Sequence, residues 1–117
     1  MHGFAKDLDL SHLISGELTS VSIDQNNIYF AFVPDNHICI SGEWKVIDDK
    51  NSLVDGGILG EDKDAYKIHK LLGKKIKDYK INSPKSLFII FNNNWILEII
   101  DNSDHYESCS ISPNIYI

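Results

Sequence analysis

The 117-residue chain carries one pattern of apolar residues and turns twice, and this repeat constrains its fold more than any other feature. The two copies align over about residues 13–48 and 71–111, first at an offset of 58 and then, after one extra turn residue, at 59. Aligned positions include Leu13 and Leu71, Leu18 and Ile76, Ile28 and Leu87, Phe30 and Ile89, Phe32 and Phe91, and Ile38 and Leu97. A repeat with this register predicts two structurally equivalent units.

Each copy predicts a three-stranded antiparallel meander. Three short segments rich in β-branched and aromatic residues follow an apolar pair, and polar turns such as residues 25–27 and 92–94 separate them. We therefore predict a mainly β fold, bordering on α+β, in which two pseudo-symmetric antiparallel meanders form a sandwich or a strongly bent sheet. About eight strands and one or two short helices would complete it.

The length suits a single domain over residues 1–117 with its own hydrophobic core. Between the two copies, residues 49–61 contain Asn51-Ser52, Gly56-Gly57 and Gly60, which predict a long loop. Residues 63–72 predict a helix with one apolar face that ends at Gly73. Residues 7–14 are either a short helix or an irregular arm.

The middle strand of each copy is apolar on both of its faces. Residues 28–33 and 87–91 alternate without a polar side, which is typical of a strand covered from two directions. The simplest cover is the rest of the same chain. The alternative is a homodimer that buries Phe88 and Ile90 against a second copy.

Motifs for catalysis and metal binding are missing from the sequence. The five histidines and two cysteines lack metal-ligand spacing, and the glycines of the central loop lack the lysine and hydroxyl residue of a phosphate loop. One cluster places a histidine among carboxylates: Asp101, Asp104, His105, Tyr106 and Glu107. Such a histidine could act as an acid or base in an enzyme or ligand site, but a solvated turn is the simpler interpretation. We predict no catalytic residue, no cofactor and no metal.

The cysteines and the first residues indicate the compartment. Cys39 and Cys109 both lie in apolar predicted strands, which favours two buried free thiols in a reducing environment. The first residues lack the apolar stretch of a signal peptide, and no segment reaches membrane-spanning length. We expect a cytoplasmic protein.

Charge divides unequally along the chain. Residues 1–64 hold twelve acidic residues and four lysines, a balance of −8, whereas residues 65–117 have a balance of +2. Many of the acids fall between residues 48 and 64. This distribution opposes binding to nucleic acid or to an anionic membrane and favours a basic protein partner. An acidic loop that merely keeps the protein soluble is the alternative.

The second copy also carries the residues of a family resemblance. The chain resembles a family of small bacterial two-unit β proteins of unknown function. The resemblance rests on Leu72-Gly73-Lys74, residues 87–91, residues 95–99 and Tyr106-Glu107-Ser108, together with Gly42-Glu43-Trp44 in the first copy. Members of that family resemble immunity proteins paired with polymorphic toxins, including those of contact-dependent growth inhibition. The first copy departs from the pattern, because Ser15-Gly16 stands where glycine alone should follow the apolar pair.

The resemblance implies a non-enzymatic immunity protein that neutralises a cognate toxin, expected to be a basic nuclease, by covering its active site. A structural or oligomerising domain is the alternative, and a ligand-binding domain or enzyme ranks below both. The predicted partner-binding residues are Trp44, Asp48, Asp49, Asp55, Glu61, Asp62 and Asp64.

Overall fold

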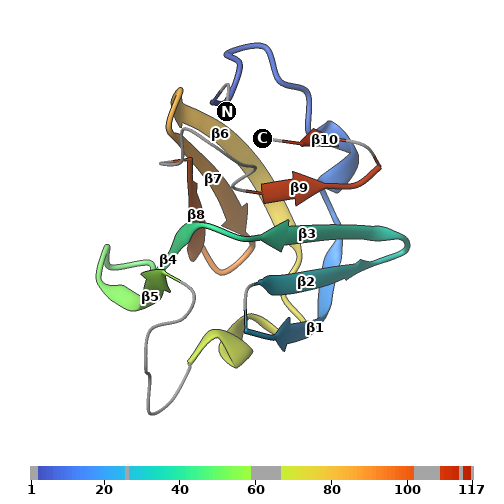
Figure 1. Cartoon of the computed structure of the whole chain (residues 1–117). Coiled ribbons are helices and arrows are strands. Elements are labelled where there is room, and N and C mark those ends of the chain that lie inside the picture. Colours follow the sequence, from blue (N-terminus) through green and yellow to red (C-terminus); the bar gives the residue numbers. More distant parts are fainter. Residues whose placement is uncertain (1–2, 26, 59–66, 102–108, 114, 117) are drawn as a thin grey trace.

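The computed structural model describes residues 3–25, 27–58, 67–101, 109–113 and 115–116 (Figure 1). This part of the chain folds almost entirely into β structure, as predicted. Its strands are β1 (Glu17–Ile23), β2 (Ile28–Val33), β3 (Asn36–Ile40), β4 (Glu43–Ile47), β5 (Leu53–Ile58), β6 (Ile76–Ser83), β7 (Ser86–Phe91), β8 (Ile96–Ile100), β9 (Cys109–Ile111) and β10 (Ile115–Tyr116). Two 3-10 helices, η1 (Ser11–Leu13) and η2 (Ile68–Leu71), precede β1 and β6.

The strands form two antiparallel five-stranded sheets. Sheet A has the order β1-β2-β3-β9-β10, and sheet B has the order β5-β4-β8-β7-β6. Each sheet therefore contains one complete meander and a two-stranded hairpin from the other half of the chain. The strands of the two sheets run across one another (Figure 1).

Two predictions about the segment between the copies are wrong. The predicted loop 49–61 contains β5, because residues 53–58 pair with β4 through a turn built on Asp48. In the predicted helix 63–72, residues 63–66 lie outside the described residues, and the remainder forms the 3-10 helix η2. Only Ile68 and Leu71 are buried there, and their spacing of three residues suits a single 3-10 turn.

The sequence repeat is a repeat of strand register. Leu18 lies opposite Phe32 in sheet A, and their counterparts Ile76 and Phe91 lie opposite each other in sheet B. The bulge after Leu18 has its counterpart after Ile76. The same holds across the next pair of strands, where the aligned positions keep their partners in both sheets. The two predicted meanders are thus structurally equivalent.

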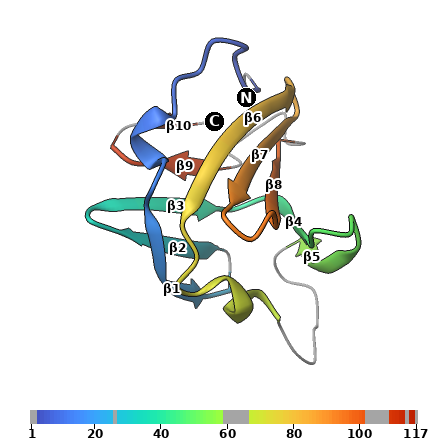
Figure 2. The same cartoon turned by 180° about the vertical axis from the view of Figure 1, so that it is seen from behind.

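Hydrogen bonds between the halves are reciprocal. The Ser15 N–H donates to the Ile76 carbonyl, and the Gly73 N–H donates to the Leu18 carbonyl, each at 2.8 Å. The Leu18 N–H donates to the carbonyl of Lys74, and the Ile76 N–H to that of Gly16, each at 2.9 Å. The donors and acceptors of each pair exchange under an offset of 58. They surround the bridge between Glu17 and Lys75, where β1 and the start of β6 run side by side (Figure 2).

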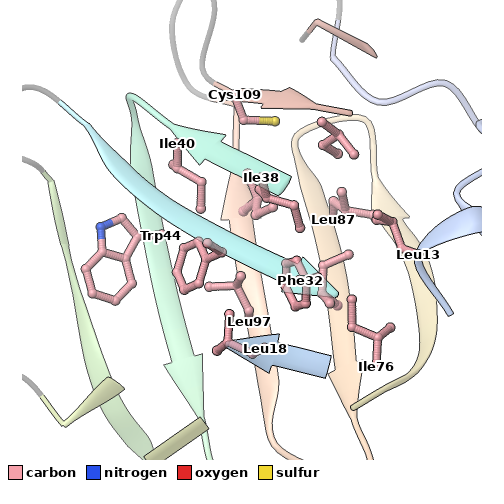
Figure 3. Close-up of a cluster of buried hydrophobic side chains, with 14 of the residues drawn as sticks. Leu13, Leu18, Phe32, Ile38, Ile40, Trp44, Ile76, Leu87, Leu97 and Cys109 are labelled. Atoms are coloured by element: carbon pink, nitrogen blue, oxygen red, sulfur yellow. The ribbon is translucent and has the colours of Figure 1, made fainter. Parts of the chain in front are cut away.

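One hydrophobic core lies between the two sheets. Alternation along β2 and β7 points Phe30, Phe32, Ile89 and Phe91 inward, where each is no more than 3% exposed. The counterparts Phe32 and Phe91 stack, with ring centroids 6.4 Å apart. Figure 3 shows that residues of both sheets and Leu13 of η1 contribute to this cluster.

The outer faces of the middle strands are less covered than predicted. Tyr29 and Val33 of β2 are 39% and 46% exposed, and Phe88 and Ile90 of β7 are half-buried. Cover of both faces by the same chain, the simplest alternative, is wrong for β2, because the second sheet covers only the inner face. The outer faces of the two sheets are therefore the large surfaces on which function can reside.

The turns after η1 and η2 allow a matched test of the repeat. Ser15 and its counterpart Gly73 both adopt positive φ, at 74° and 83°, which is costly for any residue with a Cβ. We expect Ser15→Gly to stabilise the fold by about 0.5–1 kcal/mol and Gly73→Ser to destabilise it by about 1 kcal/mol.

Urea unfolding followed by tryptophan fluorescence measures both changes. Shifts of the same sign in the two variants would contradict the equivalence of these turns.

Candidate functional site

Two of the predicted partner-binding residues are buried. Trp44 lies on the inner face of β4 and is 1% exposed, at one end of the core cluster (Figure 3). Asp55 lies opposite Val46 in β5 and is 2% exposed. The prediction that these two side chains contact a partner is therefore wrong, because strand alternation directs both into the molecule.

Asp55 instead anchors the second 3-10 helix. Its Oδ2 accepts the N–H of Lys67, the residue before η2. In the first copy Asp9 has the same task, since its Oδ1 accepts the N–H of Ser11 at 2.9 Å. Hydrogen bonds from Ser11 hold the pKa of the Asp9 carboxyl below its ordinary value. A carboxylate thus accepts an N–H group at the start of each 3-10 helix. Asp9 is two residues from its donor in the sequence, whereas Asp55 is twelve residues from its donor.

The acidic turn between β4 and β5 is only partly available to a partner. Asp48 Oδ1 accepts the N–H groups of Lys50 and Ser52, each at 2.9 Å, so this carboxylate shapes the turn. Asp49 is exposed beside it. The other predicted acids, Glu61, Asp62 and Asp64, lie outside the described residues.

The outer face of sheet A is a broad surface without charged side chains at its centre. In register across the strands, it presents Ser22, Tyr29, Cys39 and Ser110 in one row and Ser20, Ala31 and His37 in the next. Val33 continues the face beside Glu17 at its edge. Most of these side chains are exposed, and Ala31, Cys39 and Ser110 are intermediate. We call this surface the sheet A face.

Hydrogen bonds organise one end of the sheet A face. The Asn27 side-chain oxygen accepts the Ser41 hydroxyl at 2.6 Å and lies 3.8 Å from the Cys39 Sγ. Asp24 accepts the Asn27 N–H at 2.8 Å and so fixes the β1–β2 turn. Desolvation, with the nearby Asp24 carboxylate, raises the pKa of the Tyr29 phenol. The Tyr29 phenol therefore stays uncharged at neutral pH.

Acidic groups border this face, and the strands of sheet A contain no lysine or arginine, although Lys75 lies opposite Glu17. Residues 7–44 contain no lysine or arginine, and neither do residues 109–116. Glu17 lies at the end of β1, and Asp24 and Asp35 lie in the turns on either side of β2. Three of the twelve acidic residues in the first half thus lie at the edges of sheet A.

The outer face of sheet B differs in both respects. An aliphatic row crosses four strands through Leu53, Ile47, Ile96 and Ile90, of which Leu53 is 65% exposed. The adjacent row is charged and contains Lys45, Glu98 and Lys80. Ser86 donates its hydroxyl to Glu98 Oε2 at 2.6 Å. Sheet B therefore mixes charges of both signs with apolar residues.

The serine and histidine residues that lie close together serve the fold. Ser112 Oγ donates to Asn36 Oδ1 at 3.0 Å and accepts the His37 N–H at 3.0 Å. The His12 ring nitrogen lies 2.6 Å from the Ser112 main-chain oxygen. These contacts fasten η1 and the β9–β10 turn to β3. Of the predicted histidine–carboxylate cluster, Asp101 is buried, and residues 102–108 lie outside the described residues.

Comparison with known proteins adds no relative. No family model, curated protein or solved structure matches the chain. Within the described residues, no group of three or more histidine, cysteine or acidic side chains is placed to hold a metal ion. The described helices are also too short to cross a membrane.

The sequence carried two signals for the sheet A face that the prediction did not use. The first is the run of 38 positions, residues 7–44, that contains six acidic residues and no lysine. The second is the alternation in β2 and β3, which gives small or uncharged residues at every outward position. The concentration of acids in residues 48–64 drew attention to the loop instead.

The buried carboxylate of Asp55 gives a stability prediction. We expect Asp55→Ala to lower the free energy of unfolding by about 2–3 kcal/mol, because a hydrogen bond to a charged group is lost and the Lys67 N–H is left without its acceptor. The exposed Asp49→Ala should change it by less than about 0.5 kcal/mol. Urea denaturation checks both, and equal effects would show that Asp55 does not anchor η2.

The two thiols should react differently. Burial raises the pKa of the Cys39 thiol, so less thiolate is present at pH 8 than for a free cysteine. Cys39 should react more slowly than free cysteine with a disulfide reagent and accelerate as the pH rises. Cys109, which is 2% exposed, should react only in denaturant. Fast reaction of both thiols in the native protein would contradict the placement of Cys39 in β3 and Cys109 in β9.

Proposed function

We propose that the chain is an immunity protein, a non-catalytic β domain that binds a cognate bacterial toxin and neutralises it by covering its active site. The observation that carries this proposal is the segregation of charge. The first half of the chain has a balance of −8, and its residues 7–44 contain no lysine or arginine. A surface with one sign of charge attracts a partner of the opposite sign.

A basic nuclease is the toxin that fits this charge best. Such an enzyme must bind phosphate groups, so its active site carries lysine and arginine. Carboxylates of an inhibitor can occupy the same positions as the phosphates. Asp24 and Asp35 are exposed carboxylates on which this interaction would draw. The protein would act in the cytoplasm, without a cofactor and without binding nucleic acid or membrane.

A homodimer is the second candidate, and one observation favours it. The aliphatic row on sheet B ends in Leu53, which is exposed to an extent unusual for leucine in a strand. A second copy could cover that row, which includes Ile90, together with Phe88. Sedimentation of the protein alone tests this alternative, since Ile90→Arg would dissociate such a dimer.

The proposal predicts tight and salt-dependent binding to the product of the adjacent upstream gene. Isothermal titration should give a Kd below about 10 nM at low salt. Affinity should fall at least about 10-fold when the ionic strength rises from roughly 0.05 to 0.5 M, because added salt screens the charges. Cells that make the toxin should survive only when they also make this chain.

The control is a toxin from an unrelated system, which should neither bind nor be neutralised. No binding to the adjacent gene product, together with no protection of the cells, would refute the immunity function.

A further inference from the structure

We propose that the sheet A face is the surface that docks the partner, and that the partner presents basic side chains around an uncharged centre. This assignment rests on the proposed function and narrows it. It excludes the acidic β4–β5 turn and the outer face of sheet B as the main contact.

The make-up of the sheet A face matches the centre of a protein interface. Charged side chains are depleted at the centre of such interfaces, and tyrosine is enriched there. Here Tyr29 is 39% exposed and lies between Ser22 and Cys39 in the register of three strands. Ala31 and the exposed Val33 extend the same face along β2. Strand β2 thus presents no charged side chain of its own to a partner.

The rim of the face determines the kind of partner. Asp24 and Asp35 lie in the turns at opposite ends of β2, and Glu17 lies beside Val33. Sheet A supplies no lysine, so Asp24 and Asp35 form a rim of one sign, whereas Glu17 lies opposite Lys75. A second copy of the chain would bring two acidic rims together, and their charges would repel. A basic partner would instead place positive charges against Asp24 and Asp35. Charge therefore selects a basic protein over self-association.

The internal repeat supplies a comparison surface on the same molecule. Ala31 corresponds to Ile90 at an offset of 59, and each lies on the outer face of the middle strand of its meander. On sheet B the equivalent surface holds Lys45 and Lys80 among acids. A basic partner would meet like charges there. The two copies thus share a backbone but differ in the surface they offer.

Two matched pairs of variants test the assignment by titration with the adjacent gene product. Ala31→Arg places a long cation at the centre of the sheet A face and should weaken binding about 100-fold, whereas Ile90→Arg should change it less than about 3-fold. Asp35→Lys should weaken binding about 10-fold, and Asp49→Lys, which changes the net charge equally, less than about 3-fold.

Urea unfolding verifies that each variant is folded, and the Asp35 pair decides if Ala31→Arg is not. Equal effects within each pair, or larger effects of Ile90→Arg and Asp49→Lys, overturn the assignment while the immunity function stands. No binding by the wild-type chain overturns both. A wild-type dimer that Ala31→Arg dissociates would show that a second copy, not a basic partner, occupies the sheet A face.

Discussion

The fold depends on the reciprocal main-chain hydrogen bonds around Glu17 and Lys75. Four bonds exchange donors and acceptors between the halves, and they join β1 to the start of β6 at the place where the two sheets meet. With this joint fixed, the hairpin of each half reaches the other sheet, since β4 pairs with β8 and β9 pairs with β3. The inner faces then close on the stacked Phe32 and Phe91. Neither half can bury its core alone.

Sequence patterns predicted the repeated unit well and the segment between the units poorly. The meanders follow from alternation and turn residues, which are local signals, so their strands appear close to the expected positions. β5 was missed because Gly56 and Gly57 weaken its local strand signal, and pairing with β4 overrides that weakness. The helix expected over residues 63–72 is reduced to η2 in its described part, since only two apolar residues anchor it.

The candidate site was harder to predict than the fold, because charge along a sequence does not say which face of a sheet it reaches. Asp55 counted as a surface acid until its place opposite Val46 showed that it points into the molecule. The prediction that Trp44 contacts a partner is wrong for the same reason. In contrast, Asp24 and Asp35 fall in separate turns and form one rim only when β2 lies between them. The two copies share the same register, while their outer faces differ in charge.

We infer that the difference in charge between the outer faces of the two sheets is the basis of function. Two-dimensional NMR of the labelled protein, titrated with the adjacent gene product, tests it most directly because equivalent residues of the two sheets are compared in one spectrum. We expect large chemical-shift changes in β2 and β3 and small chemical-shift changes at the counterpart residues in β7 and β8. Changes that are equal in the two sheets, or larger in sheet B, would contradict it.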